Sequence, residues 1–184
     1  MADEISLRAD AQRNRERILA AAEAAFFEGG AGVSLDDVAK RAGVGIGTLY
    51  RRFPTREALL AAAYNARFLA FAEDSRARAA TIDPLNALRA YIKELVRYTN
   101  LYRGFAASLG TVLQIGTAGC LATSEEGARL LANAQDAGVI RPDIGFNDIV
   151  CVVTAISLAT EKDASPEKNI DRLLSVFING LVAD

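Results

Sequence analysis

Five basic side chains and no acidic one lie between residues 38 and 56, on both sides of Tyr50. Guanidinium, ammonium and phenol groups donate hydrogen bonds to phosphate oxygens, so this segment is a candidate contact for a nucleic-acid backbone. The net charge of the 184 residues is −2, but phosphate attraction acts through a local patch, so an acidic body does not oppose it. The five basic residues are Lys40, Arg41, Arg51, Arg52 and Arg56.

Two short helices, over residues 35–42 and 46–52, are expected to position these side chains, with a turn at Gly43. Helices that cross at a steep angle need a small residue where their backbones approach, here Ala39, and a turn residue that tolerates positive φ. Ser34 is expected to cap the first of them through its side chain. Five apolar residues would fix both helices to a third one: Val38, Ala42, Val44, Leu49 and Phe53. This pattern is typical of a DNA-binding helix-turn-helix.

The rest of the chain predicts helices, and no segment alternates as a strand does. A first helix over 11–28 ends at Gly30, a natural left-handed cap. A long fourth helix, capped by Thr55, is expected from Arg56 to about Ala80. The remaining helices are expected from Pro84 to about Thr99, from Gly104 to about Leu121, from Ser124 to Gly138, from Asn147 to about Lys162, and from Ser165 to Leu181.

The composition excludes several chemistries. The chain has no histidine, so the usual general base of hydrolase triads is missing, and no acid, base and nucleophile converge in the sequence. Its two cysteines, Cys120 and Cys151, lie far apart in apolar surroundings, which predicts inert thiols instead of a zinc site. We therefore expect neither an enzyme nor a metal or other cofactor.

The chain carries no sign of export or of membrane insertion. Its N-terminal segment is polar and charged, which does not fit a secretory signal. The longest nearly apolar stretch, residues 149–159, is shorter than the roughly 20 residues that span a bilayer. We expect this stretch to be a buried helix of a cytoplasmic protein that has no membrane partner.

Three segments of the N-terminal third resemble the TetR/AcrR family of transcriptional regulators: residues 15–22 (RERILAAA), 39–44 (AKRAGV) and 47–54 (GTLYRRFP). Residues 137–143 (AGVIRPD) and 173–181 also look like the end of that family's regulatory domain. The resemblance implies an all-α fold of about nine helices and a homodimer joined by its last two helices, with an effector pocket among the middle ones. It places a three-helix helix-turn-helix domain at 11–56 (motif 34–53) and a helical ligand-binding and dimerisation bundle at 57–184.

The same motif suggests roles for individual residues toward double-stranded DNA. Thr48 and Tyr50 resemble family residues that bind phosphates, and Arg51 is the candidate for hydrogen bonding to a base edge, that of guanine. The sequence departs from the family at the tip of the second helix, where Gly45 supplies no capping oxygen and Ile46 is apolar, suited to a thymine methyl group. The full set of expected DNA contacts is Ser34, Gly45, Ile46, Gly47, Thr48, Tyr50, Arg51, Arg52 and Arg56, with Arg13 or Arg17 as weaker additions.

Two further sets of residues are expected in the helical bundle. Aromatic residues at roughly helical spacing indicate either an apolar core or a ligand pocket with phenol groups. For Ser34, in the helix-turn-helix, helix capping and phosphate contact are likewise two alternatives. The pocket set is Tyr64, Phe68, Tyr91, Tyr98, Tyr102, Phe105 and Leu109. A helix that is apolar on all sides at 149–153, together with the final amphipathic stripe, predicts a four-helix dimer interface. The interface set is Ile149, Val153, Ile156, Leu174, Phe177, Ile178 and Leu181.

These features predict a homodimeric regulator that responds to a small-molecule effector and binds a palindromic operator, as a repressor or, depending on operator position, an activator. Two other classes stay open at this point. One is a helical small-molecule-binding or interaction protein that has lost DNA binding, which Gly45 and Ile46 favour. The other is an enzyme, for which the sequence offers no catalytic set.

Overall fold

The computed structural model describes the backbone of residues 2–181 and the side chains of residues 10–181. This part of the chain contains helices and no strands, so the all-α prediction is confirmed. Ten α-helices are present, one more than the expected nine or so, with a short 3-10 turn (η1) at Ala106–Ser108. Their bounds are α1 Ala2–Gly29, α2 Leu35–Ala42, α3 Ile46–Arg52, α4 Arg56–Ala63, α5 Asn65–Ala79, α6 Pro84–Asn100, α7 Leu109–Gln114, α8 Ala118–Asp136, α9 Phe146–Thr160 and α10 Glu167–Leu181.

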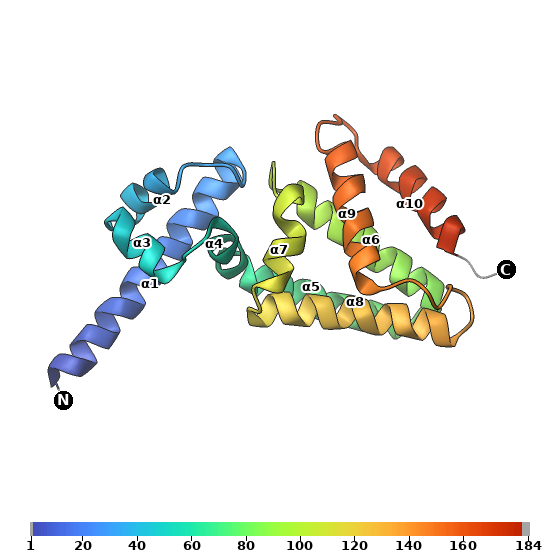
Figure 1. The fold of residues 1–184 in the computed structure, drawn as a ribbon, viewed down its shortest axis with the longest axis horizontal. Helices are drawn as coiled ribbons and strands as arrows, with labels where there is room; N and C mark the ends of the chain where they lie inside the picture. The colour runs from blue at the N-terminus through green and yellow to red at the C-terminus, as the bar shows by residue number, and fades with distance from the viewer. Residues whose placement is uncertain (1, 182–184) are drawn as a thin grey trace.

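Helices α1 to α4 form the N-terminal part of the molecule, and α4 lies between α1 and the rest (Figure 1). Their common core contains Ile18 and Phe26 of α1, Val38 of α2 and Leu49 of α3, all fully buried. Burying apolar side chains from every helix of such a small unit fixes the relative positions of α2 and α3. The predicted bounds of these two helices, 35–42 and 46–52, are confirmed.

Of the residues expected to cap helices through their side chains, Thr55 does so, whereas Ser34 and Asn147 do not. The hydroxyl of Thr55 accepts from the Ala58 amide and caps α4 as expected. The Asp83 carboxylate accepts from the Asn86 amide and caps α6, which begins at Pro84 as expected. The Ser34 side chain makes no capping hydrogen bond to α2. Asn147 does not begin α9, which starts one residue earlier, where the Gly145 amide donates to the Asp148 carboxylate (2.9 Å).

The expected long fourth helix is wrong, because it breaks at Tyr64 into α4 and α5. Tyr64 leaves the helical conformation (φ −96°, ψ 6°), and α5 begins at Asn65. At this break the Asn65 side chain accepts a hydrogen bond from the Gly119 amide of α8 (2.8 Å). This long-range contact joins the start of α5 to the start of α8, and helical periodicity does not reveal it.

The glycine-bearing stretch from Gly104 to Leu121 does not form the single helix that we expected. It contains η1 and α7, a left-handed glycine at Gly116 (φ +79°), and the first turn of α8. Thr117 begins α8, since its hydroxyl accepts from the Cys120 amide, so Ser124 lies inside α8 instead of starting a helix. A glycine in the left-handed conformation ends a helix because the chain changes direction there.

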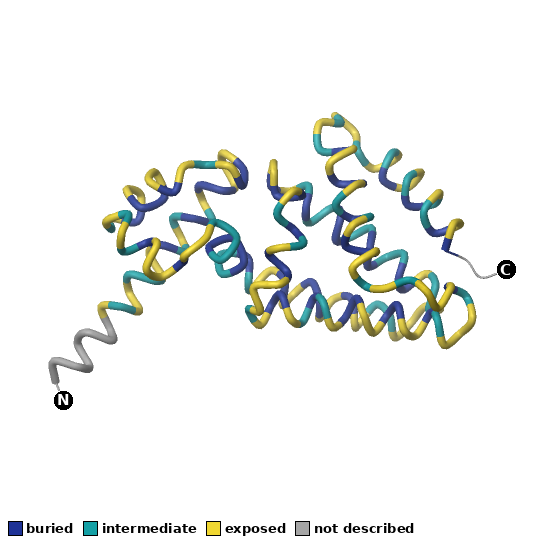
Figure 2. Tube along the Cα trace, viewed as in Figure 1, coloured by how far each residue is buried: buried dark blue, intermediate teal, exposed yellow. Residues whose placement is uncertain are grey.

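In the C-terminal part, α5 and α8 run side by side and α6 packs against α8 and α9 (Figure 1). Buried residues follow the inner faces of these helices (Figure 2). One of them is Glu126, whose carboxylate accepts hydrogen bonds from Ser75 and Arg76 of α5 and from Arg129. A buried charge is tolerated when it is paired in this way, so these contacts join α5 to α8.

No single described helix has both the length and the apolar composition to cross a bilayer. The consecutive segments Ala106–Gln114 and Ala118–Asp136, which meet at an angle of 98°, pass the criteria of length and composition only when they are taken together.

Candidate DNA interface and ligand pocket

The turn between α2 and α3 is fixed by its own backbone and by one arginine of α1. Gly43 adopts the expected left-handed conformation (φ +64°, ψ 38°). Arg17 donates from Nε to the Ala42 carbonyl oxygen (2.9 Å) and from Nη2 to the Gly43 carbonyl oxygen (2.6 Å). The guanidinium of Arg17, a weaker candidate for DNA contact, therefore holds the turn.

Helix α3 presents one polar face to solvent. Leu49 is fully buried, whereas the next three residues, Tyr50, Arg51 and Arg52, are exposed. Ser34, Gly45 and Gly47 are also exposed, and Thr48 is half-buried. Ile46 is half-buried and packs against the core, which limits the contact that it can make with a thymine methyl group. The described geometry leaves the face around Tyr50, Arg51 and Arg52 open to a duplex.

The five basic residues of this segment are not equally available to phosphates, because acidic residues from outside the segment pair with two of them. Arg41 forms a salt bridge with Glu28 of α1 (2.7 Å), and Lys40 lies 3.8 Å from Asp37. Among the described side chains, Arg51 and Arg52 make no salt bridge or hydrogen bond. The local charge counted along the sequence therefore overstates the charge offered to phosphates.

Arg56 has an intramolecular role that the sequence did not reveal. Its Nη1 atom donates to the carbonyl oxygens of Ala31 (2.8 Å) and Val33 (2.6 Å), in the loop between α1 and α2. The side chain is half-buried there. Arg56 thus joins the start of α4 to this loop, and its predicted phosphate contact has to be made by the remaining guanidinium N–H groups.

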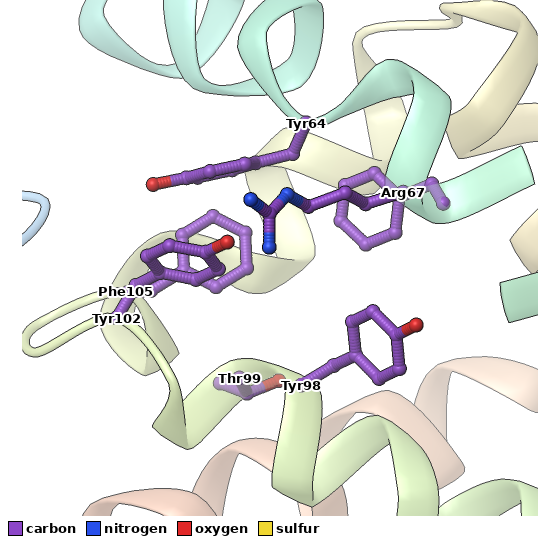
Figure 3. Close-up of a pocket in the computed structure, with 7 residues that line it drawn as sticks. Tyr64, Arg67, Tyr98, Thr99, Tyr102 and Phe105 are labelled. Atoms are coloured by element: carbon purple, nitrogen blue, oxygen red, sulfur yellow. The ribbon is translucent and has the colours of Figure 1, made fainter. Parts of the chain in front are cut away.

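Five of the seven expected pocket residues line one cavity between α5, α6 and η1 (Figure 3). The cavity has a volume of about 10 Å³, which is room for about one water molecule. Arg67 and Thr99 line it as well, and sequence reasoning missed both. Arg67 follows Tyr64 by three residues and precedes Phe68, so helical spacing was the signal that could have found it. The complete lining is Tyr64, Arg67, Phe68, Tyr98, Thr99, Tyr102 and Phe105.

Tyr91 and Leu109, the other two expected pocket residues, belong to the core. The Tyr91 hydroxyl donates to the Thr123 carbonyl oxygen (2.8 Å), and its ring lies 5.2 Å from that of Phe71. Leu109 is fully buried in the core. Both residues fit the helical spacing of the expected set. Spacing alone does not distinguish a residue that lines a cavity from one that packs in the core behind it.

The cavity contains two phenol groups without partners. The hydroxyls of Tyr64 and Tyr102 are buried and make no hydrogen bond, and the two ring centroids lie 4.2 Å apart. Burial raises the pKa of both tyrosines above the ordinary value, so both stay protonated at neutral pH. The Thr99 hydroxyl differs, since it already donates to the Leu95 carbonyl oxygen (2.7 Å). The unused hydroxyls are available as donors to a ligand.

Arg67 connects the cavity to α1. Its Nε (3.1 Å) and Nη2 (2.7 Å) both donate to Oε1 of Glu23, and its guanidinium lies 5.7 Å from the Tyr102 ring centroid. The hydrogen bonds that Arg67 donates to Glu23 raise the pKa of Arg67 above its ordinary value, so it stays cationic. The ring of Phe26, also on α1, lies 6.2 Å from that of Tyr64. Two lining residues therefore contact the first helix of the N-terminal part directly.

A third connection runs through the loop after α6. The Ala31 amide donates to the Arg103 carbonyl oxygen (2.8 Å), and Arg103 directly follows the lining residue Tyr102. Gly30 makes this approach possible, because a Cβ atom there would collide with that carbonyl oxygen, and because its φ is +82°. The walls of the cavity and the α1–α2 loop are thus joined through backbone atoms.

Six of the seven residues of the expected dimer-interface set are covered by the protomer itself. Ile149, Val153 and Ile156 of α9 and Leu174, Ile178 and Leu181 of α10 are buried within the protomer. The most apolar stripe of each helix packs onto the protomer's own core, so it is not free for a second subunit. Phe177 is half-buried. The exposed apolar residues of the two helices are Cys151, Ala155, Leu158, Ala159 and Val176.

Comparisons with known proteins agree with this architecture. Residues 18–63 match the family described as bacterial regulatory proteins, tetR family, and residues 83–183 match the family described as transcriptional regulator SbtR-like, C-terminal domain. A TetR transcriptional regulator of Streptomyces coelicolor is 34% identical, and the match covers 92% of this chain and 98% of that one, with a TM-score of 0.57. No curated protein matches the sequence.

Two more distant structures share the fold and carry ligands. The transcriptional regulator FadR of Bacillus subtilis, in complex with stearoyl-CoA, is 16% identical over 91% of this chain and 99% of its own, with a TM-score of 0.62. RolR, in complex with resorcinol, is 17% identical over 96% of this chain and 91% of its own, with a TM-score of 0.70. At these identities the likeness concerns the fold alone.

Proposed function

Because the chain belongs to the TetR family of bacterial transcriptional regulators, we propose that it acts as a homodimeric repressor that a small molecule releases from its operator. The observation that carries the DNA-binding part is the exposed face of α3, where Tyr50, Arg51 and Arg52 have no hydrogen-bond or salt-bridge partner among the described residues. This helix follows a tight turn at Gly43, which suits insertion of its exposed face into a major groove.

Within this proposal the DNA-contacting residues have two different roles. Tyr50, Arg52, Thr48 and Ser34 contact phosphates, which set the position of the protein on the duplex. Arg51 contacts a guanine edge, which makes binding depend on sequence. Residues 11–56 form the DNA-binding unit, with Gly45, Ile46 and Gly47 close to the groove, and residues 57–184 bind the ligand and the second subunit.

The exposed apolar side chains of α9 and α10 support a dimer that uses a different face from the one first expected. Leu158 is 51% exposed and Val176 is 70% exposed, and they lie on the two C-terminal helices. Exposed apolar side chains on adjacent helices are typical of a subunit interface. Two-fold symmetry would then present two copies of α3 to half-sites about one helical turn apart.

The route from ligand to DNA runs through the contacts between the cavity and α1. A ligand that enters the cavity has to move its walls, which carry the connections to Glu23, Phe26 and Ala31. Such a movement would change the separation of the two α3 helices in the dimer. The ligand acts only if it binds the released state more tightly than the DNA-bound state.

Selection of bound sequences from a random duplex pool tests this function. We expect an inverted repeat, and an affinity that falls steeply with salt concentration because most contacts go to phosphates. A reporter gene placed behind the selected sequence should be silenced by the protein; stimulation of the reporter would mean an activator. Recovery of no preferred sequence would overturn the proposal.

A second candidate is a ligand-binding protein of the same fold that no longer binds DNA. Gly45 at the start of α3 provides no side-chain cap, and three of the five basic residues are engaged within the protein. Fluorescence anisotropy with a bulk duplex at low salt separates the two. Absence of binding at micromolar protein concentration favours this candidate over the regulator.

A further inference from the structure

The polar groups that line the cavity are rich in hydrogen-bond donors and include a cation, and the acceptors that they offer are neutral hydroxyl oxygens. The donors are the Arg67 guanidinium and the buried hydroxyls of Tyr64 and Tyr102, which have no partner. Among the residues that the structure describes, no aspartate or glutamate lines the cavity, and the Thr99 hydroxyl already donates to the Leu95 carbonyl oxygen. A ligand that satisfies these groups has to bring acceptor oxygens, and beside a guanidinium a carboxylate is the best match.

The rest of the lining selects for a flat ligand. Five of the seven lining residues are aromatic, and Figure 3 shows the Arg67 side chain reaching between Tyr64 on one side and Tyr98 and Tyr102 on the other. Aromatic rings bind other rings by offset stacking or edge contact. Since the cavity holds about 10 Å³, a ring enters only when the side chain that crosses this space moves.

We propose that the cavity binds a small aromatic carboxylate, whose carboxylate takes the Arg67 guanidinium away from Glu23 and accepts hydrogen bonds from Tyr64 and Tyr102. The proposal rests on the proposed function, in which a ligand in this cavity controls DNA binding. It adds the chemical class of the ligand and the contact that the ligand breaks.

The existing ion pair is suited to such an exchange. The side chains of Arg67 and Glu23 are 43% and 44% exposed, and a single carboxylate oxygen, Oε1, accepts both hydrogen bonds. Pairs that are this exposed contribute little to stability, because water competes for both charges. A ligand carboxylate replaces this contact with a bidentate one, in which the guanidinium donates to both carboxylate oxygens. It also accepts hydrogen bonds from the two buried hydroxyls that now lack a partner.

The exchange has a direct consequence for α1. Glu23 lies on α1, three residues before Phe26, which contacts the Tyr64 ring. Loss of the Arg67 contact removes the ion pair that joins α5 to the helix on which α2 and α3 are packed. Tyr102 moves with the ligand as well, and the next residue, Arg103, holds the α1–α2 loop through its carbonyl oxygen.

Isothermal titration calorimetry with three probes, benzoate, phenylacetate and 2-naphthoate, tests the class of ligand. Each probe is compared with its neutral amide. We expect at least one carboxylate to bind the wild-type protein at least ten-fold more tightly than its amide. Binding of no carboxylate, or equal binding of carboxylate and amide, overturns the proposal.

Variants test the exchange itself, with the tightest probe from the first experiment. Arg67→Met should weaken binding at least ten-fold, whereas Arg78→Met, on the same helix and outside the cavity, should leave it unchanged. Glu23→Gln should tighten binding several-fold, since the ligand no longer competes with a carboxylate. Unchanged or weaker binding in Glu23→Gln overturns the proposal, and this variant decides alone if Arg67→Met does not fold.

A separate measurement distinguishes failure of this inference from failure of the proposed function. Duplex binding by the protein without any probe reports on the regulator alone. A protein that binds its selected duplex but none of the three carboxylates refutes the ligand class and leaves the regulator standing. When a probe binds, we expect it to lower duplex affinity in the wild-type protein at least ten-fold more than in Arg67→Met.

Discussion

Arg17 of α1 donates a hydrogen bond to the carbonyl oxygen of Gly43, the left-handed residue between α2 and α3 (2.6 Å). The orientation of α3 therefore depends on a side chain from a helix that does not belong to the helix-turn-helix pair. It also depends on a backbone conformation that glycine adopts without strain.

Gly43→Ala should destabilise the protein by about 1–2 kcal/mol, the cost of a side chain in the left-handed region. The added Cβ would also lie 3.2 Å from Nη2 of Arg17 and disturb its hydrogen bond. Gly43→Asn should cost less, because asparagine tolerates this conformation better. Urea denaturation measures both, with Gly32→Ala as the control, since no atom lies within 4 Å of a Cβ there. Equal stability of Gly43→Ala and wild type would contradict the prediction.

Arg51→Ala should lower discrimination at one base pair of each half-site by about 1–3 kcal/mol. Tyr50→Phe, which removes only a hydroxyl, should weaken binding to every sequence by a similar factor, because a phosphate contact carries no sequence information. Competition binding against a set of single-base variants of the selected operator measures both effects. If Arg51→Ala weakens all sequences alike, Arg51 is a phosphate contact.

Arg56→Met should reduce the free energy of unfolding by about 1.5–3 kcal/mol, because the carbonyl oxygens of Ala31 and Val33 lose a charged donor. The matched control is Arg52→Met, whose exposed side chain has no partner among the described residues and whose loss should change stability by less than about 0.5 kcal/mol. Chemical denaturation compares the two. If Arg56→Met and Arg52→Met have similar stabilities and Arg56→Met loses DNA affinity, the main role of Arg56 is a phosphate contact.

Val176→Glu should convert the dimer into a monomer, because it buries a charge in the proposed α9–α10 interface. The matched control is Phe27→Glu on α1, since Val176 and Phe27 are both 70% exposed. Sedimentation velocity at micromolar concentration measures the oligomeric state. A variant that remains dimeric places the interface elsewhere, and a dimer lost in Phe27→Glu as well would deny any special role to α10.

Gly119→Ala should destabilise the protein by about 1–3 kcal/mol, the usual cost of overpacking. A Cβ at this position would collide with the Asn65 carbonyl oxygen and lie 2.8 Å from Cβ of Phe68, where α5 meets α8. In Gly110→Ala the nearest neighbour of a Cβ outside the helix is Cγ1 of Val150, 3.9 Å away, so this control should be neutral or slightly stabilising. Thermal denaturation that shows no difference between the two variants would contradict the close approach of α5 and α8.

The helix-turn-helix was predictable because its signals are local. The bounds of α2 and α3, the left-handed Gly43 and the cap at Thr55 follow from residue types within a few positions of each other. All five aromatic residues that line the cavity were also in the expected set, since a helix repeats its faces along the sequence.

Features that depend on long-range contacts were missed. The break at Tyr64 accompanies the contact between Asn65 and Gly119, which are 54 residues apart. The role of Arg67 needs Glu23, 44 residues away. Most of the expected dimer set is buried within the protomer, because periodicity identifies the most apolar face of a helix, which packs onto the protomer's own core. Periodicity does not tell which of the remaining faces a second subunit covers.

Tyr64 occupies both the joint between α4 and α5 and the wall of the cavity. Variants designed to make this protein a biosensor for other compounds should therefore keep Tyr64, because we expect its replacement to change both the ligand specificity and the effect of the ligand on DNA binding. Tyr98 lines the cavity from α6, so ligand specificity can be varied there while the joint between α4 and α5 keeps its native residue.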